Sequence, residues 1–174
     1  MFDEKKLAAI AAMEEQTKTF TDLSDEVWEY AELSLYEHKS CAAFVRELTA
    51  AGFQVESPYC GLDTAFLASY GSGKPVIAFL AEYDALSGLS QEGCKTEYAP
   101  IEGSNNGHGC GHNLLGAGSF AAAYAVKKYL EATGKEGTVL LHHGHEMIRG
   151  TLGEHHRFPA EGTYLGAADG EHIH

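Results

Sequence analysis

The segment from Asn106 to Gly116 reads Asn-Gly-His-Gly-Cys-Gly-His-Asn-Leu-Leu-Gly, and it constrains the fold more than any other stretch. Two imidazoles and one thiol lie within five positions, and an alanine-rich run typical of a helix follows. On an extended backbone Cys110 and His112 would point to the same side, and such a pair suits a borderline-soft ion such as zinc. The macrodipole of the following helix would favour the thiolate. The segment predicts a metal-ligand pair at a helix N-terminus; glycines before a helix are also a common packing device.

Composition narrows the class of protein. The chain has 174 residues with 44% hydrophobic content, which suits one ordinary domain with a sizeable core. Its formal net charge of −13 argues against a nucleic acid or an anionic membrane as partner. The sequence has no apolar run of membrane-spanning length, and its start lacks the layout of a signal peptide. Four cysteines without a framework spacing fit reduced thiols, so we expect a cytoplasmic location.

Three helices are predicted in the first third of the chain. Residues 3–19 carry apolar side chains at helical spacing with a charged opposite face. Thr21 or Ser24 is suited to cap a second helix, and Ser40 is suited to cap a third helix that ends at Gly52.

The rest of the chain alternates strands with a long helix. Residues 53–56 alternate as in a short strand. Residues 64–70 and 75–81 are strand-like and flank Gly-Ser-Gly-Lys, which predicts a hairpin. The second of these runs is apolar throughout, as expected for a strand buried on both faces. A helix over 114–132 and a strand that begins at Thr138 complete a layered α/β domain, with its site at the carboxyl end of a strand.

The predicted loop over residues 82–113 holds the chemistry. Glu82-Tyr83-Asp84 follows the apolar strand directly, and alternation places Glu82 and Asp84 on one side. In a metal site such a carboxylate would orient a ligating imidazole through its free N–H. Two solvated carboxylates at a turn are the alternative interpretation. Loops of this length within a compact domain are usually functional.

Several separated stretches together resemble one family, the binuclear metallo-amidohydrolases of the aminoacylase and carboxypeptidase G type (peptidase family M-twenty). The similarity is to the amidohydrolase branch and within it to the aminobenzoyl-glutamate hydrolase type. The stretches that carry it are Pro75–Leu86, Gly88–Gln91 and Gly107–Gly116, supported by Ser24–Leu33, Gly52–Val55 and Thr64–Phe66. The resemblance spans about residues 5–139, and it is specific because the motifs occur in the order of the family.

The resemblance implies a three-layer α/β/α catalytic domain with a mixed, mostly parallel sheet. It also implies two divalent metal ions, zinc or manganese, and hydrolysis of an amide bond. In that case Cys110 supplies a bridging thiolate, His112 an imidazole ligand, and Asp84 the carboxylate that orients the site. Glu82 stands where other branches place a ligating histidine, and it is the third candidate ligand. One ion would polarise the scissile carbonyl, and the pair would lower the pKa of a bridging water.

The chain departs from the family after the strand that begins at Thr138. There the family presents Pro-Ala-Glu-Glu, which supplies the general base and a further ligand, whereas this chain reads Leu-Leu-His-His-Gly-His-Glu from Leu140. No general base is found, and Pro-Ala-Glu at 159–161 is followed by glycine. The change in character predicts an N-terminal part of a catalytic domain over 1–141 and a divergent His-rich tail over 142–174, produced by truncation or a shifted reading frame.

The tail could form a site of its own, since seven of the ten histidines follow residue 140. His145-Glu146-x-x-Arg149 approaches a zinc-protease motif, but a guanidinium cannot replace the second histidine of that motif. A polar tail without helix or strand periodicity is the simpler interpretation.

Three hypotheses follow. In the first, the chain is the N-terminal part of a metal-dependent amidohydrolase and is inactive alone. The substrate of that enzyme would be an N-acyl or aminobenzoyl amino acid or a similar dipeptide-like small molecule. The second is a non-catalytic metal-binding or interaction module, and the third is a metal site completed by the tail. We also expect a homo-oligomer, because residues 75–81 and 114–132 would lack elements that normally cover them.

Overall fold

The computed structural model describes residues 3–143 and 163–165. The helices are α1 Glu4–Glu14, α2 Thr17–Tyr30, α3 His38–Ala50 and α4 His112–Thr133. The strands are β1 Gln54–Glu56, β2 Leu67–Ser72, β3 Val76–Ala81, β4 Leu86–Ser87, β5 Asn106–Gly107, β6 Gly137–His143 and β7 Thr163–Leu165.

Five of these strands form one mixed sheet in the order β1-β2-β6-β3-β7. The pairings of β1 with β2 and of β2 with β6 are antiparallel, whereas β3 is parallel to both β6 and β7. The predicted α/β class is confirmed, and parallel and antiparallel pairings are equal in number. The carboxyl ends of β3 and β6 lie together, since Ala81 pairs with His143.

The predicted hairpin between residues 64–70 and 75–81 is wrong. β2 and β3 do not pair with each other, because β6 lies between them and pairs with both. The reason is the apolar character of β6: Val139, Leu140 and Leu141 are all buried, and a central position removes both of their faces from water. The connection from β2 to β3 therefore spans a strand that comes more than fifty residues later in the sequence.

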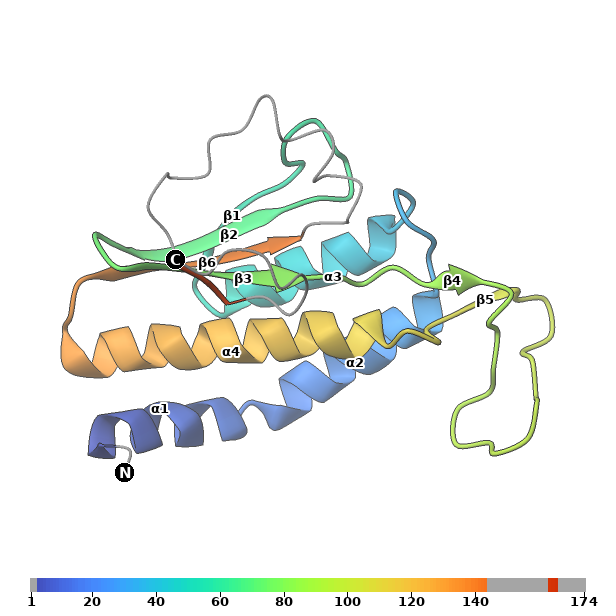
Figure 1. Cartoon of the computed structure of the whole chain (residues 1–174), viewed down its shortest axis with the longest axis horizontal. Helices are drawn as coiled ribbons and strands as arrows, with labels where there is room; N and C mark the ends of the chain where they lie inside the picture. The colour runs from blue at the N-terminus through green and yellow to red at the C-terminus, as the bar shows by residue number, and fades with distance from the viewer. Residues whose placement is uncertain (1–2, 144–162, 166–174) are drawn as a thin grey trace.

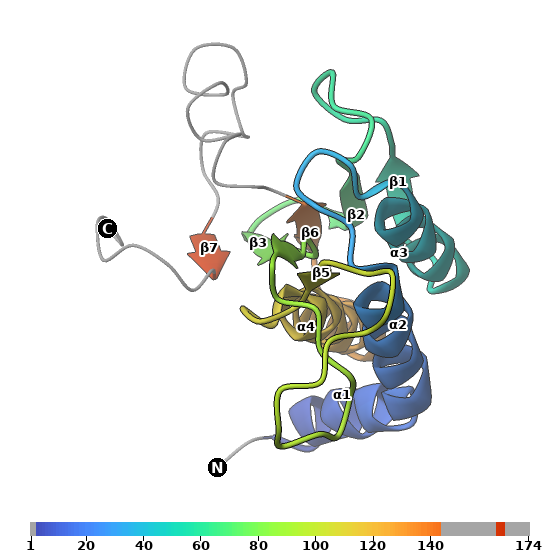
Figure 2. The same ribbon diagram turned by 90° about the vertical axis from the view of Figure 1, so that its right-hand side faces the viewer.

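Of the helices, α4 makes most of the contacts with the sheet, as Figures 1 and 2 show. This helix packs against β3, β6 and β2, while α1 and α2 pack against α4, and α3 lies against β1. In Figure 2, α1, α2 and α4 lie on the same side of the sheet. The hydroxyl of Ser119 on α4 donates to the Leu80 carbonyl of β3 at 2.6 Å, which fixes the helix along that strand. Among the residues that the structure describes, no helix has the length and apolar character to cross a bilayer.

The predicted boundaries of the first two helices are wrong. The chain bends at Glu15 and Gln16, and α2 begins at Thr17, so Thr21 and Ser24 lie inside the helix rather than at its cap. Both α1 and α2 pack against α4, with Ala9 of α1 and Phe20, Leu23, Ser24 and Val27 of α2 buried. Tertiary packing has overridden the local capping preference here.

The N-terminus of the third helix is capped by a side chain from outside the helix. Ser40 does not cap α3; instead the Glu32 carboxylate accepts hydrogen bonds from the backbone N–H groups of Lys39 at 3.0 Å and Ser40 at 2.9 Å. A carboxylate at this end also complements the helix dipole. The predicted end at Gly52 is confirmed: its φ of +84° and the bond from the Phe53 N–H to the Leu48 carbonyl complete a Schellman turn.

Stacked aromatic rings form the centre of the core. The ring of Tyr83 lies 5.0 Å from that of Phe44 and 3.7 Å from the imidazole of His143, and Phe66 stacks on Phe44 at 5.9 Å. Phe44, Phe66 and Tyr83 are fully buried. Leu80 departs from the prediction of a strand buried on both faces, because it remains 40% exposed. The core therefore joins β3, β6 and α3 at the end of the sheet where the candidate site lies.

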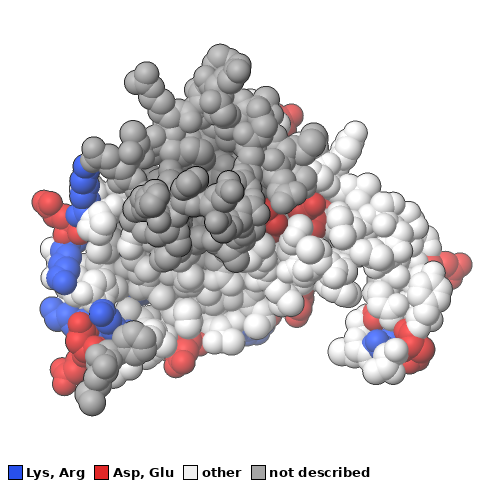
Figure 3. Space-filling model, viewed as in Figure 1, with Lys and Arg blue, Asp and Glu red and all other residues white. Residues whose placement is uncertain are grey.

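The segment between β4 and β5 projects from the body as a long loop (Figures 1 and 3). On the face shown in Figure 3, lysine and arginine side chains gather at the end of the molecule opposite this loop. Tyr98 and Ile101 of the loop are exposed. The predicted long loop over 82–113 is therefore present, closed at its base by the two short strands.

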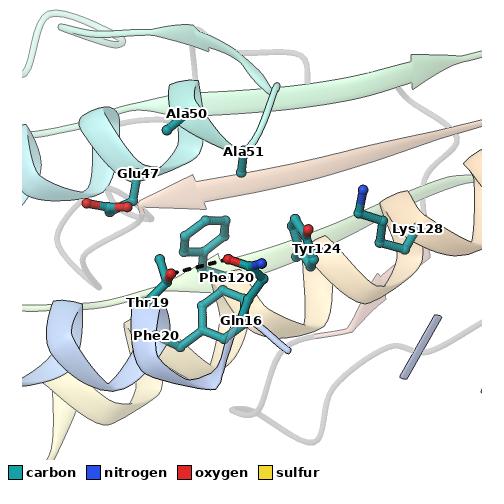
Figure 4. A pocket seen from close by; sticks show the side chains of 9 residues that line it. All are labelled: Gln16, Thr19, Phe20, Glu47, Ala50, Ala51, Phe120, Tyr124 and Lys128. Atoms are coloured by element: carbon teal, nitrogen blue, oxygen red, sulfur yellow. Dashed lines mark hydrogen bonds between the residues drawn. The ribbon is translucent and has the colours of Figure 1, made fainter. Parts of the chain in front are cut away.

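A cavity of about 370 Å³ lies among the helices, away from the loop. The rings of Phe20, Phe120 and Tyr124 line it together with the charged side chains of Glu47 and Lys128 (Figure 4). Each of these two charges already has an ion-pair partner on its own helix. We therefore attribute the cavity to imperfect helix packing.

Gly116 and Gly118 form a matched pair on α4. A Cβ at Gly116 would lie 2.7 Å from the Glu82 carbonyl oxygen and 2.8 Å from Cζ of Phe44, whereas a Cβ at Gly118 would meet nothing within 4 Å. We expect Gly118→Ala to raise the free energy of unfolding by up to about 1 kcal/mol through helix propensity. Gly116→Ala should lower it by about 1–3 kcal/mol through overpacking. Urea denaturation measures both, and equal stabilisation by the two variants would contradict the close contact of α4 with the end of β3.

His142 makes the stability depend on pH. Burial lowers the pKa of this imidazole from 6.5 to about 4. A proton therefore binds more tightly in the unfolded chain, so stability is complete above pH 6.5 and falls as the pH drops towards 4. Between about pH 7 and pH 4.5 we expect a loss of about 2.5 kcal/mol from this group. Urea denaturation of His142→Phe over this range should give a flatter profile than the parent chain, and identical slopes would show that His142 is not the cause.

Candidate functional site

Two segments that are distant in sequence meet at the carboxyl end of β3. The first, residues 82–87, continues from β3 into β4, and the second, residues 106–113, runs from β5 into α4. The short antiparallel pair β4–β5 joins them, with Leu86 opposite Gly107 and Ser87 opposite Asn106. This ladder brings the predicted carboxylates next to the predicted imidazole.

His112 is held between two carboxylates. Its Nδ1 lies 2.8 Å from Oδ1 of Asp84, and its Nε2 lies 3.2 Å from Oε2 of Glu82. Asp84 is almost fully buried, whereas His112 and Glu82 retain some exposure. Nδ1–H donates to Asp84, which leaves two states for Nε2. In the protonated ring Nε2–H donates to Glu82, and in the neutral ring the lone pair of Nε2 is free to bind a cation together with Glu82.

Tyr83 points away from these two carboxylates, as strand alternation predicts. Its hydroxyl donates to the Thr64 carbonyl at 2.6 Å, and its ring lies in the core. Burial raises the pKa of Tyr83 well above its usual range. Glu82 and Asp84 therefore reach the same imidazole because the side chain between them is fixed on the opposite side.

Cys110 does not lie on an extended backbone as expected. Residues 109 and 110 form a turn, and Gly111 takes a φ of +81° before α4 begins at His112. Only glycine adopts this left-handed conformation at little cost. The thiol of Cys110 is exposed, next to the first turn of α4.

Gly107 is required for space rather than for its φ angle, and Gly109 lies against the side chain of Leu89. A Cβ at Gly107 would lie 1.9 Å from the Leu89 carbonyl oxygen, and a Cβ at Gly109 would lie 2.5 Å from Cδ1 of Leu89. The base of the long loop therefore packs directly on the backbone around His108.

Sequence reasoning missed His108 and Asn113. Both are 4% exposed, and both contact backbone carbonyls of α2: His108 through Nε2 at 3.0 Å from Val27, and Asn113 through Nδ2 at 3.3 Å from Ser24. Burial lowers the pKa of His108, which favours the neutral ring. Their polar character next to the Cys110–His112 pair was visible in the sequence, but their partners on α2 were not.

The side chains of the candidate site are of the types that bind a divalent ion. An imidazole whose Nδ1 is engaged by Asp84 can offer Nε2 to a metal ion, and the carboxylate of Glu82 lies 3.2 Å from this atom. The thiol of Cys110, two residues before His112, is also a suitable kind of donor for zinc. Within residues 3–143, however, no three histidine, cysteine, aspartate or glutamate side chains are grouped closely enough to hold an ion. The roles of Cys110, His112, Glu82 and Asp84 therefore remain predictions.

The predicted tail motifs lie outside the described residues. This applies to His145-Glu146-x-x-Arg149 and to Pro-Ala-Glu at 159–161. The described part does include His142 and His143 at the end of β6, both buried. His143 contacts the Ala81 carbonyl through Nδ1 at 3.1 Å.

Solved structures show the same fold. A dinuclear metal-binding peptidase of the M20 family from Bacillus subtilis superposes with a TM-score of 0.57 at 20% identity, over 78% of this chain and 40% of that one. The aminobenzoyl-glutamate utilization protein of Klebsiella pneumoniae gives a TM-score of 0.52 at 14% identity, over 78% of this chain and 38% of that one. The architecture is that of an M20 peptidase domain.

Curated sequences show the relationship more directly. The chain is 47% identical over 128 residues to a subunit of the p-aminobenzoyl-glutamate hydrolase of Escherichia coli K12, and the match covers 74% of this chain and 27% of that protein. It is 31% identical over 138 residues to the mouse Xaa-Arg dipeptidase, covering 73% and 28%. No family model matches the chain. The chain belongs to the M20 family, and it spans about a quarter of the length of the curated relatives it matches.

Proposed function

We propose that the chain carries part of the catalytic domain of a metal-dependent amidohydrolase. The reaction would be hydrolysis of the amide bond of an N-acyl or aminobenzoyl amino acid. The observation that supports this is the placement of His112 between Asp84 and Glu82, where the end of β3 meets the start of α4. The relatives, which are named as part of an aminobenzoyl-glutamate hydrolase and as a dipeptidase, support the small-molecule substrate class.

His112 and Cys110 would hold a zinc or manganese ion, with Glu82 as a third donor. Such an ion would polarise an amide carbonyl. Asp84 would keep the imidazole oriented by accepting its Nδ1–H, as it does in the structure at 2.8 Å. The buried position of Asp84 excludes water from that hydrogen bond and so restricts rotation of the ring.

The chain on its own would be inactive, because the described residues place no carboxylate at the end of β6 to act as a general base. The family resemblance predicts a pair of glutamates after β6, and the described part of this strand ends with His142 and His143 beside the end of β3. Both rings are buried, and His143 uses Nδ1 on the Ala81 carbonyl. Neither supplies a carboxylate to the site.

Self-association remains a prediction. Three apolar side chains near the site, Leu80, Leu114 and Leu115, are 40%, 67% and 38% exposed and would contribute to such an interface.

Metal binding should depend on Cys110. We expect Cys110→Ser to weaken zinc binding by more than about tenfold, because a thiolate ligand is lost. Cys94→Ser is the matched control, since Cys94 is also exposed but lies in the long loop away from His112. Isothermal titration calorimetry of the full chain measures both.

Replacement of the histidines at 145, 155, 156, 172 and 174 by glutamine tests the tail. If that variant loses binding while Cys110→Ser retains it, the tail is the metal site.

The amidase activity should be negligible. Positioned proton transfer contributes typically 10²–10⁴-fold, and the Glu-Glu pair that the resemblance predicts for this role does not follow Thr138 in the sequence. Zinc- or manganese-loaded protein should hydrolyse p-aminobenzoyl-glutamate no faster than the metal in buffer, as measured by release of aminobenzoate. Turnover at about 1 s⁻¹ or more, abolished by Cys110→Ser, would contradict the prediction and show that the chain supplies its own general base.

A further inference from the structure

Three polar side chains of the segment 106–113 converge on one helix. Nδ2 of Asn106 donates to the Ala31 carbonyl at 3.1 Å, and Nε2 of His108 lies 3.0 Å from the Val27 carbonyl. Nδ2 of Asn113 donates to the Ser24 carbonyl at 3.3 Å and to its hydroxyl at 3.0 Å. The three acceptor residues follow at spacings of three and four, which places them along one face of α2 and its C-cap.

The tautomer of His108 follows from its partner. A carbonyl oxygen only accepts, so Nε2 carries the hydrogen, and the ring also stacks on Trp28 at 6.1 Å. Nδ1 of His108 and Oδ1 of Asn113 are buried, and neither has a hydrogen-bond partner within the described residues. Apolar side chains of similar size would fill these positions without unsatisfied atoms. The hydrogen bonds to α2 fix the orientation of both side chains against that helix.

The other half of the site is fixed by the same part of the chain. The Ala85 N–H donates to the Glu32 carbonyl at 2.7 Å, and Leu33 forms a parallel bridge with Ala85. Ala85 directly follows Asp84, the carboxylate that holds His112. Residues 24–33 thus contact both segments that meet at the imidazole.

We propose that the C-terminal part of α2 and its continuation, residues 24–33, position the metal ligands, with His108 and Asn113 as the principal positioning residues and Asn106 as a weaker one. The proposal rests on the proposed metal site at Cys110 and His112. Because the turn at 109–111 is glycine-rich, its backbone has little intrinsic preference for one conformation. Side-chain anchors on both flanks, at His108 and Asn113, would hold this turn in the conformation that presents the two ligands.

The test compares two variants of His108 with a control on the same helix as Asn113. His108→Phe keeps an aromatic ring against Trp28 and removes the donor, whereas His108→Gln keeps an N–H donor. Thr133→Val is the control: it removes a part-buried hydrogen bond to a backbone carbonyl at the opposite end of α4. Isothermal titration calorimetry with zinc, on full-length protein, should show affinity at least about tenfold weaker for His108→Phe. His108→Gln should recover most of this affinity, and Thr133→Val should leave it unchanged.

Hydrogen exchange supplies a readout that needs no metal. In the parent chain the N–H groups of Gly111, Leu114 and Leu115 are bonded to the carbonyls of His108 and Gly111. We expect these amides to exchange at least about tenfold faster in His108→Phe, while amides of β3 and β6 keep their rates. Asn106→Ala, at a less buried position, should show a smaller change in the same direction and replaces His108→Phe if that variant does not fold.

The outcomes separate the two proposals. If zinc binds through Cys110 but neither the affinity nor the exchange rates respond to loss of the His108 or Asn106 anchor, the positioning role is overturned. If the parent chain binds no zinc, the proposed metal site is wrong, and the exchange rates alone then decide whether α2 holds the segment. Faster exchange of core amides together with those of the segment would show general destabilisation and would also overturn the positioning role.

Discussion

The pairing of β6 with both β2 and β3 is the interaction on which the rest of the structure depends. It separates β2 from β3 and places the end of β6 beside the end of β3. It also sets α4, which precedes β6, along the sheet so that the start of the helix reaches Glu82. A hairpin between β2 and β3 would satisfy the local sequence, but β6 could then no longer pair with both of these strands.

This also explains which parts of the fold were predictable. The strand at 53–56, the helix after His112 and the strand from Thr138 each have a local pattern that tertiary packing supports. The hairpin prediction was wrong because strand order depends on a partner more than fifty residues away, and turn residues carry no information about it. The start of α3 was wrong for a similar reason: the Glu32 carboxylate, eight residues before Ser40, caps the helix in place of the local serine.

The candidate site also has features that the sequence predicted and features that it did not. Alternation along the chain after β3 was sufficient to place Glu82 and Asp84 on one side, because the core fixes Tyr83 on the other. The arrangement of Cys110 and His112 was not predictable from spacing, since a left-handed Gly111 turns the backbone between them. Hydrogen bonds from side chains to helix carbonyls follow no sequence period, so the contacts of His108 and Asn113 with α2 could be found only in the structure.

The end of β6 supplies two buried imidazoles to the core beside the candidate site. His143 pairs with Ala81, stacks on Tyr83 and bonds to the Ala81 carbonyl, so it adds to the core at the point where β3 delivers Glu82 to the site. Burial keeps His142 neutral at pH 7, because its pKa is lowered to about 4. His142 and His143 therefore close the core at the carboxyl end of β6, beside the segment that carries Glu82 and Asp84.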